Sequence, residues 1–367
     1  MSNYLNETQK RTSSEENTFK LLGNDPISDT LTVQKKIYPD FSHCSTKSLN
    51  SKYIQWGNYR VLQNYVKATK TFPCNKSVTY ATHGELGFLH NLVELASRWQ
   101  IFTIKMIKFS IHSFVGPISV AVYAPGESFQ KTLEVIFHLR ECSHNEVKKL
   151  VTFHIFFESD RIPNGIPKAN ELLSPKINCS IKLHDIDYWN SSHHLNEFLY
   201  PVNVARNVAK SNSATYFYFT SDIELYPSLN IIPEFLKLMQ RPDFSNTSRR
   251  RVYVLPVFEM KSNLVIPNTK KELLSLINEE NAFLFHLNIC RRCQEVPNYE
   301  SYIMCLMDYE YHVLDNAFII HKPGIKVRDK KVLKSSVVEK QKTLIKTIIK
   351  EECDKIYGMR DGCIIVR

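Results

Sequence analysis

The stretch that most constrains the fold is residues 215–229, TYFYFTSDIELYPSL. Its first six residues are all aromatic or β-branched, which is typical of a buried strand. Pro227 stops the extended run, and the pattern IIPEFLKLMQ then predicts a helix over residues 231–240. We therefore predict a buried central strand followed by a turn and a helix.

Two acidic residues, Asp222 and Glu224, directly follow this strand. Open α/β sheets bind their ligands at the carboxyl ends of strands. Two carboxylates one residue apart can hold a hard divalent cation and, through it, a diphosphate. The alternative is an ordinary solvated acidic turn, and so short a motif does not decide between the two.

Strand and helix patterns alternate along most of the chain. Further strands are predicted over residues 77–84, 117–125, 150–159, 251–260 and 309–321. Helices are predicted over residues 86–99, 127–143, 203–212, 270–286 and 334–358. This alternation predicts an α/β fold with a doubly wound, mostly parallel sheet.

The ends of the chain differ from this core. Residues 1–50 are polar and without periodicity, so we expect a flexible leader or stem. We predict a domain over residues 51–330, a helical segment over 331–367 and a surface insert over 100–114. No run reaches the ~20 apolar residues of a membrane span, and we expect neither an anchor nor an export signal within this sequence.

The formal net charge of +10 indicates an anionic partner. A nucleotide diphosphate or an acidic glycan fits this charge. We expect no nucleic-acid partner, because no RRM, zinc-finger or helix-turn-helix signature accompanies the charge. Dinucleotide-binding, P-loop, zincin and G-x-S-x-G hydrolase motifs are also missing from the sequence.

The sequence contains nine cysteines, and only Cys290 and Cys293 form a C-x-x-C. This pair predicts a small disulfide loop or two free thiols rather than a redox centre. The remaining cysteines are compatible with a disulfide framework. N-glycosylation acceptors, which suit a lumenal protein, occur at Asn6, Asn75, Asn178, Asn190 and Asn246.

His321 ends the last predicted strand. A lone histidine commonly has a structural role, which requires only a hydrogen-bond partner. If His321 approaches Asp222 and Glu224, however, two carboxylates and one imidazole form a suitable Mn²⁺ site. The cation would neutralise a leaving diphosphate.

Other polar residues are predicted to surround the diphosphate. Arg206 and Asn207 lie on the helix before the central strand, and Lys322 follows His321. Thr82 lies near the end of the first core strand, and we predict that it also contacts the diphosphate ligand. The alternative for Arg206 and Lys322 is that each is an ordinary solvated side chain.

Together these segments resemble glycosyltransferase family 49. The likeness covers most of residues 53–350 in order, and its motifs are YRVLQNYV, SVTYATHG, PISVAVYAPGE, VTFHIFFES, PVNVARNVAKSNSATYFYFTSDIELYPSL, VYVLPVFEM, KKELLSLI, ICRRCQEVPNY and VLDNAFIIHKPG. The resemblance implies a GT-A fold, with a mostly parallel central sheet flanked by helices, that binds Mn²⁺ and a UDP-sugar. Asp222 and Glu224 match the D-x-D acids of the family, with Glu in the second place, and His321 matches its late histidine.

The resemblance also implies a reaction and a location. Glucuronic acid would pass from UDP-glucuronate to a xylose-type acceptor on an O-mannosyl glycan of a glycoprotein. The expected place is the Golgi lumen, or the Golgi membrane in type II orientation, and a homologous glycosyltransferase is a possible partner.

One departure from the family concerns the acceptor side. NYESY, residues 298–302, runs almost at once into IMCLMDYEYHVLDNAF, whereas relatives carry several tens of residues there. The shortened part resembles the region that supplies the catalytic base, so we assign no catalytic residue. The alternative to an enzyme is a catalytically impaired relative that binds a UDP-sugar or a glycan.

Overall fold

The computed structural model describes nine stretches of the chain. These are residues 44–100, 115–143, 145–172, 177–180, 200–245, 250–289, 299–321, 324–325 and 336–363. The predicted leader (except for 44–50), residues 101–114 of the predicted insert, Lys322 and the C-x-x-C pair lie outside them.

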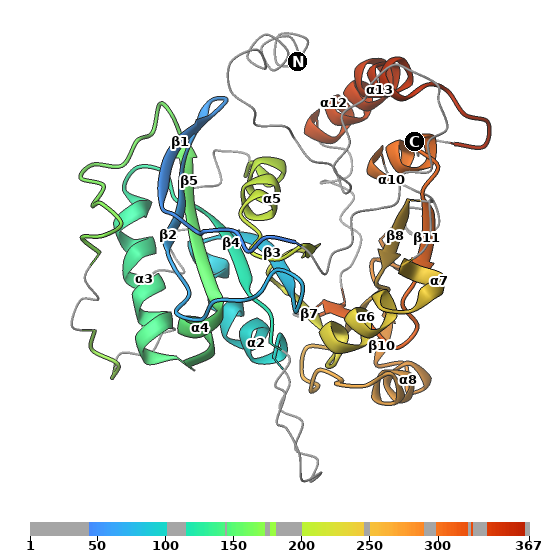
Figure 1. The fold of residues 1–367 in the computed structure, drawn as a ribbon, viewed down its shortest axis with the longest axis horizontal. Coiled ribbons are helices and arrows are strands. Elements are labelled where there is room, and N and C mark those ends of the chain that lie inside the picture. The colour runs from blue at the N-terminus through green and yellow to red at the C-terminus, as the bar shows by residue number, and fades with distance from the viewer. Residues whose placement is uncertain are drawn as a thin grey trace.

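The first half of the described chain forms a six-stranded sheet with helices on both faces (Figure 1). Its strands, in sheet order, are β1 (Lys52–Trp56), β2 (Tyr59–Val66), β5 (Val151–Glu158), β4 (Ile118–Tyr123), β3 (Val78–Glu85) and β6 (Phe217–Thr220). The pairings β5–β4, β4–β3 and β3–β6 are parallel, and those of β2 with β1 and β5 are antiparallel. The predicted α/β class is therefore confirmed.

The alternation of side chains along β4 explains why both faces of this sheet are covered. Ile118, Val120 and Val122 face a core that includes the helices α2 (Asn91–Arg98) and α3 (Ser128–Cys142). Ala121 and Tyr123 face the helix α5 (Val202–Ser211). A strand that is apolar on both faces suits a parallel sheet buried between helices.

The second half forms two smaller sheets (Figure 1). One has the order β10 (Ala282–Leu284), β9 (Val257–Met260), β12 (Ile319–His321) and β7 (Leu225–Pro227), and the other pairs β11 (Glu310–Val313) with β8 (Arg251–Val254). The remaining helices are η2 (Leu86–Phe88), α4 (Asn145–Leu150), α6 (Ile231–Met239), α7 (Pro242–Ser245), α8 (Lys270–Asn278), α10 (Tyr299–Leu306), α12 (Ser336–Leu344), η5 (Ile345–Ile349) and α13 (Lys350–Tyr357).

The prediction of a buried central strand over residues 215–220 is wrong in its position. The strand β6 lies at the edge of its sheet and is only partly buried. On its open side, the ring of Phe217 lies 5.0 Å from Phe235 of α6. The ring of Phe219 lies 5.2 Å from Tyr80 of the neighbouring strand β3. A short aromatic strand can therefore be covered by a helix rather than by a second neighbouring strand.

Three other predicted elements are each two elements in the structure. The run 251–260 breaks at Leu255–Pro256, where the chain leaves one sheet for the other. The predicted helix over 270–286 ends at Asn278, and Glu280 adopts a left-handed conformation with φ 53° before β10. The predicted strand over 309–321 contains both β11 and β12.

The disulfide framework anticipated from the cysteine count is present. Bonds join Cys44 to Cys74, Cys142 to Cys179 and Cys305 to Cys363. Cys353 is a buried thiol. Within the stretches that the structure describes, every helix is too short or too polar to cross a membrane.

A buried hydrogen-bond network joins α5 to the sheet through His154. The backbone N–H of Asn64 donates to Nδ1 of His154 at 2.8 Å, and Nε2 lies 2.9 Å from the hydroxyl of Ser119. That hydroxyl donates to the carbonyl of Ala209 on α5. Because Nδ1 accepts, the proton of the neutral ring is on Nε2.

We predict that His154 makes stability depend on pH. Burial lowers its pKa from 6.5 to about 3, so between these values the unfolded chain binds a proton that the folded chain does not. Stability should therefore rise with pH across this window, by up to about 1.4 kcal/mol per pH unit from this group. Urea unfolding of the wild type and of His154→Gln at several pH values tests this. The prediction fails if the two proteins show the same slope.

Candidate functional site

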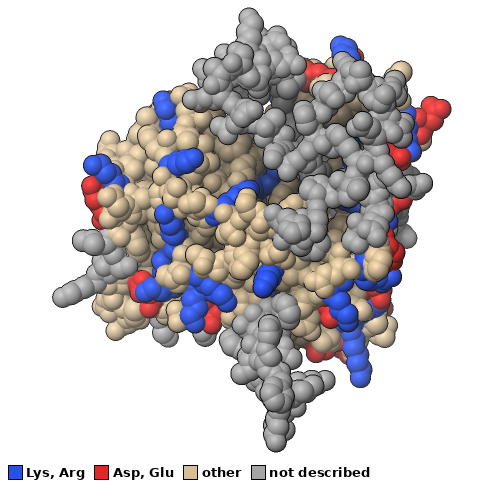
Figure 2. All heavy atoms as spheres, in the orientation of Figure 1, with Lys and Arg blue, Asp and Glu red and all other residues tan. Residues whose placement is uncertain are grey.

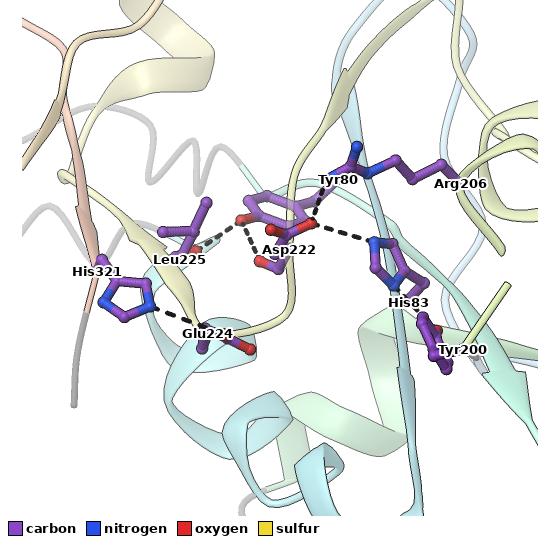
Figure 3. Close-up of polar contacts among 8 residues, drawn as sticks. All are labelled: Tyr80, His83, Tyr200, Arg206, Asp222, Glu224, Leu225 and His321. Atoms are coloured by element: carbon purple, nitrogen blue, oxygen red, sulfur yellow. Dashed lines mark hydrogen bonds and ion pairs between the residues drawn. The ribbon is translucent and has the colours of Figure 1, made fainter. Parts of the chain in front are cut away.

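The two acids lie on a tight turn between the two halves of the fold (Figure 3). The N–H of Leu225 donates to the carbonyl of Asp222 at 3.1 Å, and the hydroxyl of Tyr80 donates to the carbonyl of Leu225 at 2.6 Å. Tyr80 is buried, and its ring lies 5.0 Å from Trp99 and 5.2 Å from Phe219. Burial raises the pKa of Tyr80, so its hydroxyl stays protonated and holds the turn.

Strand register brings His83 opposite Asp222. Ala81 of β3 pairs with Thr220 of β6, and the N–H of Ser221 donates to the carbonyl of Ala81. Two residues further along these parallel strands, His83 and Asp222 are neighbours. Both therefore lie at the carboxyl edge of the sheet.

One carboxylate oxygen of Asp222 receives two side-chain contacts (Figure 3). Nη2 of Arg206 donates to Oδ1 at 2.8 Å, and Nε2 of His83 lies 3.1 Å from the same oxygen. Nδ1 of His83 lies 3.0 Å from the hydroxyl of Tyr200. Burial alone would raise the pKa of Asp222, but the contacts with His83 and Arg206 outweigh burial and hold that pKa well below its usual range.

His321 reaches the second acid from the other half of the fold. It pairs with Leu225 in the antiparallel ladder of β12 and β7, which puts it beside the turn. Its Nε2 lies 3.6 Å from Oε1 of Glu224, beyond ordinary hydrogen-bond distance. The side chain of His321 is only 2% exposed, and neither ring nitrogen has a hydrogen-bond partner within the described part of the chain.

The structure brings some of the predicted residues together. Glu224 lies near His321, and Arg206 contacts Asp222. Asn207, the next residue of α5, points in another direction because adjacent residues of a helix do not share a face. Its role in donor binding stays a prediction.

Two other residues, Lys322 and Thr82, were predicted to contact the donor. Lys322 lies outside the described residues. Thr82 is fully buried and alternates with His83, so its side chain is on the opposite face of β3. Contact of either residue with a donor stays a prediction.

His83 and Tyr200 were missed by the sequence interpretation. His83 follows Thr82 directly at the end of a predicted strand, and this position could have indicated it. No short-range pattern indicated Tyr200, because its contact with His83 joins residues 117 positions apart.

The donor types present suit a divalent cation. Carboxylate and imidazole ligands bind Mn²⁺, and a buried imidazole without a hydrogen-bond partner is a natural ligand. Asp222 and Glu224 keep 39% and 24% of their side chains exposed, so a cation could reach them. No group of three ligands is already closed around one point among the residues described. The residues thus fit a cation but would have to converge on it.

Comparison with known proteins identifies the class. The family described as glycosyl-transferase for dystroglycan, glycosyltransferase family 49, matches residues 77–303 and 300–358. The chain belongs to this family of glycosyltransferases. The resemblance found from the sequence motifs is therefore confirmed.

The individual relatives share only 24–27% sequence identity with this chain. A beta-1,4-glucuronyltransferase 1 of Danio rerio is 27% identical over 67% of this chain and 56% of its own length. The Homo sapiens protein of that name is 24% identical over 67% and 55%, and a Gallus gallus xylosyl- and glucuronyltransferase LARGE1 is 25% identical over 34% and 22%. The chain thus spans about half the length, or less, of the curated relatives it matches.

We predict that Tyr80→Phe loosens the turn that carries the acids. Loss of the buried hydroxyl should cost about 1 kcal/mol, and up to roughly 3, because the carbonyl of Leu225 loses a donor. Amide hydrogen exchange over residues 222–225, measured by mass spectrometry, should become faster.

Tyr65→Phe is a matched control for this experiment. The hydroxyl of Tyr65 donates to the carbonyl of Pro167 at 2.7 Å, away from the turn. This variant should lose similar stability without faster exchange at residues 222–225. Equal exchange in both variants would contradict the role given to Tyr80.

Proposed function

We propose that this protein is a Mn²⁺-dependent glycosyltransferase of the GT-A fold that transfers glucuronic acid from UDP-glucuronate to a glycan. The observation that supports this most is the position of Asp222, Glu224 and His321 around the turn that joins the six-stranded sheet to β7. The chain brings them there from two separate β-sheets. Because the chain belongs to a glycosyltransferase family, we interpret these three residues as ligands of a cation that binds a sugar-nucleotide donor.

Some residues of the site would bind the cation, and others would contact the donor. Asp222, Glu224 and His321 would hold Mn²⁺, which supplies positive charge to a departing diphosphate. Oδ1 of Asp222 is held by Arg206 and His83, which leaves Oδ2 for the cation. The guanidinium of Arg206 is partly exposed and would add a second positive charge beside the diphosphate.

The donor and acceptor are proposed from the relatives. Their names contain glucuronyltransferase, which supports UDP-glucuronate as the donor. A xylose-type sugar on an O-mannosyl glycan of a glycoprotein is the proposed acceptor. Basic side chains are spread over the face drawn in Figure 2 rather than gathered in one patch. This spread, with a net charge of +10, suits a small anionic donor better than a nucleic acid.

The disulfides support a location in the Golgi lumen, with a homologous glycosyltransferase as a possible partner. Three disulfide bonds indicate an oxidising compartment. The N-glycosylation acceptor at Asn178 is exposed, as such a compartment would require of a modified residue.

A second candidate function is binding of the donor without efficient transfer. The family match falls into two pieces that overlap at residues 300–303. This division agrees with the shortening inferred there from the resemblance. The shortened part resembles the acceptor and base region. In this case the cation and UDP would still bind.

Turnover with purified protein distinguishes these two functions. The protein is incubated with Mn²⁺, UDP-glucuronate and a xyloside, and the product is measured by mass spectrometry. Asp222→Ala should reduce the rate about 100-fold or more, because charge stabilisation by the metal is worth several kcal/mol. Asp243→Ala, a surface carboxylate paired with Arg241, is the control and should retain the rate.

Each outcome of this experiment has a defined meaning. Stabilisation by UDP and Mn²⁺ without any product would support the binding function. No turnover and no stabilisation would reject both functions. Addition of EDTA should abolish transfer and also remove the stabilisation by UDP.

Arg206 offers a separate test of the diphosphate site. Arg206→Ala should weaken UDP binding by about 10–100-fold, the range expected when a charge-assisted hydrogen bond worth about 1.5–3 kcal/mol is lost. Arg206→Lys should lose less, since it retains the charge but not the planar fork. Calorimetric titration with UDP in Mn²⁺ measures this. Lys210→Ala, on the same helix, should bind as the wild type does, and an equal loss there would contradict the role of Arg206.

A further inference from the structure

A buried carboxylate outside the proposed ligand set lies on the strand next to His321. Glu259 of β9 has no exposed surface. In the parallel ladder between β12 and β9 it is paired in register with His321. Register partners project to the same face of a sheet, and adjacent strands are about 4.8 Å apart. The row across this sheet therefore runs from Leu225 of β7 through His321 to Glu259.

The two ring nitrogens of His321 face different parts of the structure. Nε2 lies 3.6 Å from Glu224, so this nitrogen faces the acids. Nδ1 is then the nitrogen that could donate a hydrogen bond to an acceptor on the side of the ring away from the acids. It is buried and lacks a hydrogen-bond partner among the residues that the structure describes. A histidine that ligates a metal commonly donates its other N–H to a carboxylate, which fixes the tautomer and the ring orientation.

We propose that Glu259 is a positioning residue for His321, which accepts the Nδ1 proton and directs Nε2 toward the cation. This inference rests on the proposed function, since it assumes that His321 binds Mn²⁺. It adds a carboxylate that does not touch the cation itself.

Mn²⁺ affinity tests this inference without any measurement of transfer. Free Mn²⁺ is measured by electron paramagnetic resonance during titration of the full chain with MnCl₂ alone. Glu259→Met, which removes the acceptor but keeps the length, should bind Mn²⁺ about 10–100-fold more weakly. Glu259→Gln keeps a carbonyl acceptor and should lose less. Met260→Leu, next on the same strand and facing the other way, should bind like the wild type.

A second measurement separates positioning from general support of the fold. Nitrogen-15 NMR of histidine-labelled protein with Mg²⁺ reports which nitrogen of His321 carries the proton, with His321→Gln used for assignment. The wild type and Glu259→Gln should show protonated Nδ1, and Glu259→Met should show a mixture of tautomers. Thermal unfolding verifies that each variant is folded, and a variant that fails to fold is replaced by Glu259→Leu.

Failure of this inference differs from failure of the proposed function. If the wild type binds Mn²⁺ and Glu259→Met and Glu259→Gln bind it equally well, Glu259 has no positioning role. If the wild type does not bind Mn²⁺ at all, the proposed metal site is wrong, and the inference is rejected with it. Weaker binding in Glu259→Met with an unchanged tautomer would also overturn the positioning role.

Discussion

The hydrogen bond from Tyr80 to the carbonyl of Leu225 connects the two halves of the fold beside the turn that carries Asp222 and Glu224. Tyr80 belongs to the six-stranded sheet, and Leu225 begins the strand β7 of the second sheet. A buried hydroxyl bonded to a buried carbonyl is costly to break, because each group would lose its partner away from water. The turn from Asp222 to Leu225 is therefore fixed, and both acids take their positions from it.

Each acid is then oriented by a different part of the molecule. Asp222 is held from the first sheet and α5, through His83 and Arg206. Glu224 faces His321 of the second sheet. The hydrogen bonds of His154 connect α5 to the strands β4 and β5. They hold α5 in place, and with it Arg206. A cation at this edge would draw together ligands from both sheets.

Much of this arrangement could be predicted from the sequence, because it depends on local patterns. The helix α5, the strands β3, β4 and β5, and the acids after β6 all follow from runs of apolar residues and their spacing. The position of β6 at the edge could not be predicted, since strand order depends on contacts between distant segments. The contact between His83 and Asp222 depends on parallel register in the same way. Pro256 and the left-handed Glu280 ended elements that periodicity alone would have extended.

The glutamate in the second acid position agrees with the geometry of this edge. Glu224 precedes β7, and its carboxylate already lies 3.6 Å from a histidine that is fixed in a buried ladder. An aspartate at residue 224 would be shorter by one methylene group and would leave a wider gap to His321. Because His321 lies in a strand paired on both sides, its backbone is held in place and does not readily shift to close that gap. The longer side chain of Glu224 therefore brings its carboxylate closer to His321 than an aspartate would, and the departure from D-x-D is compatible with the cation site proposed above.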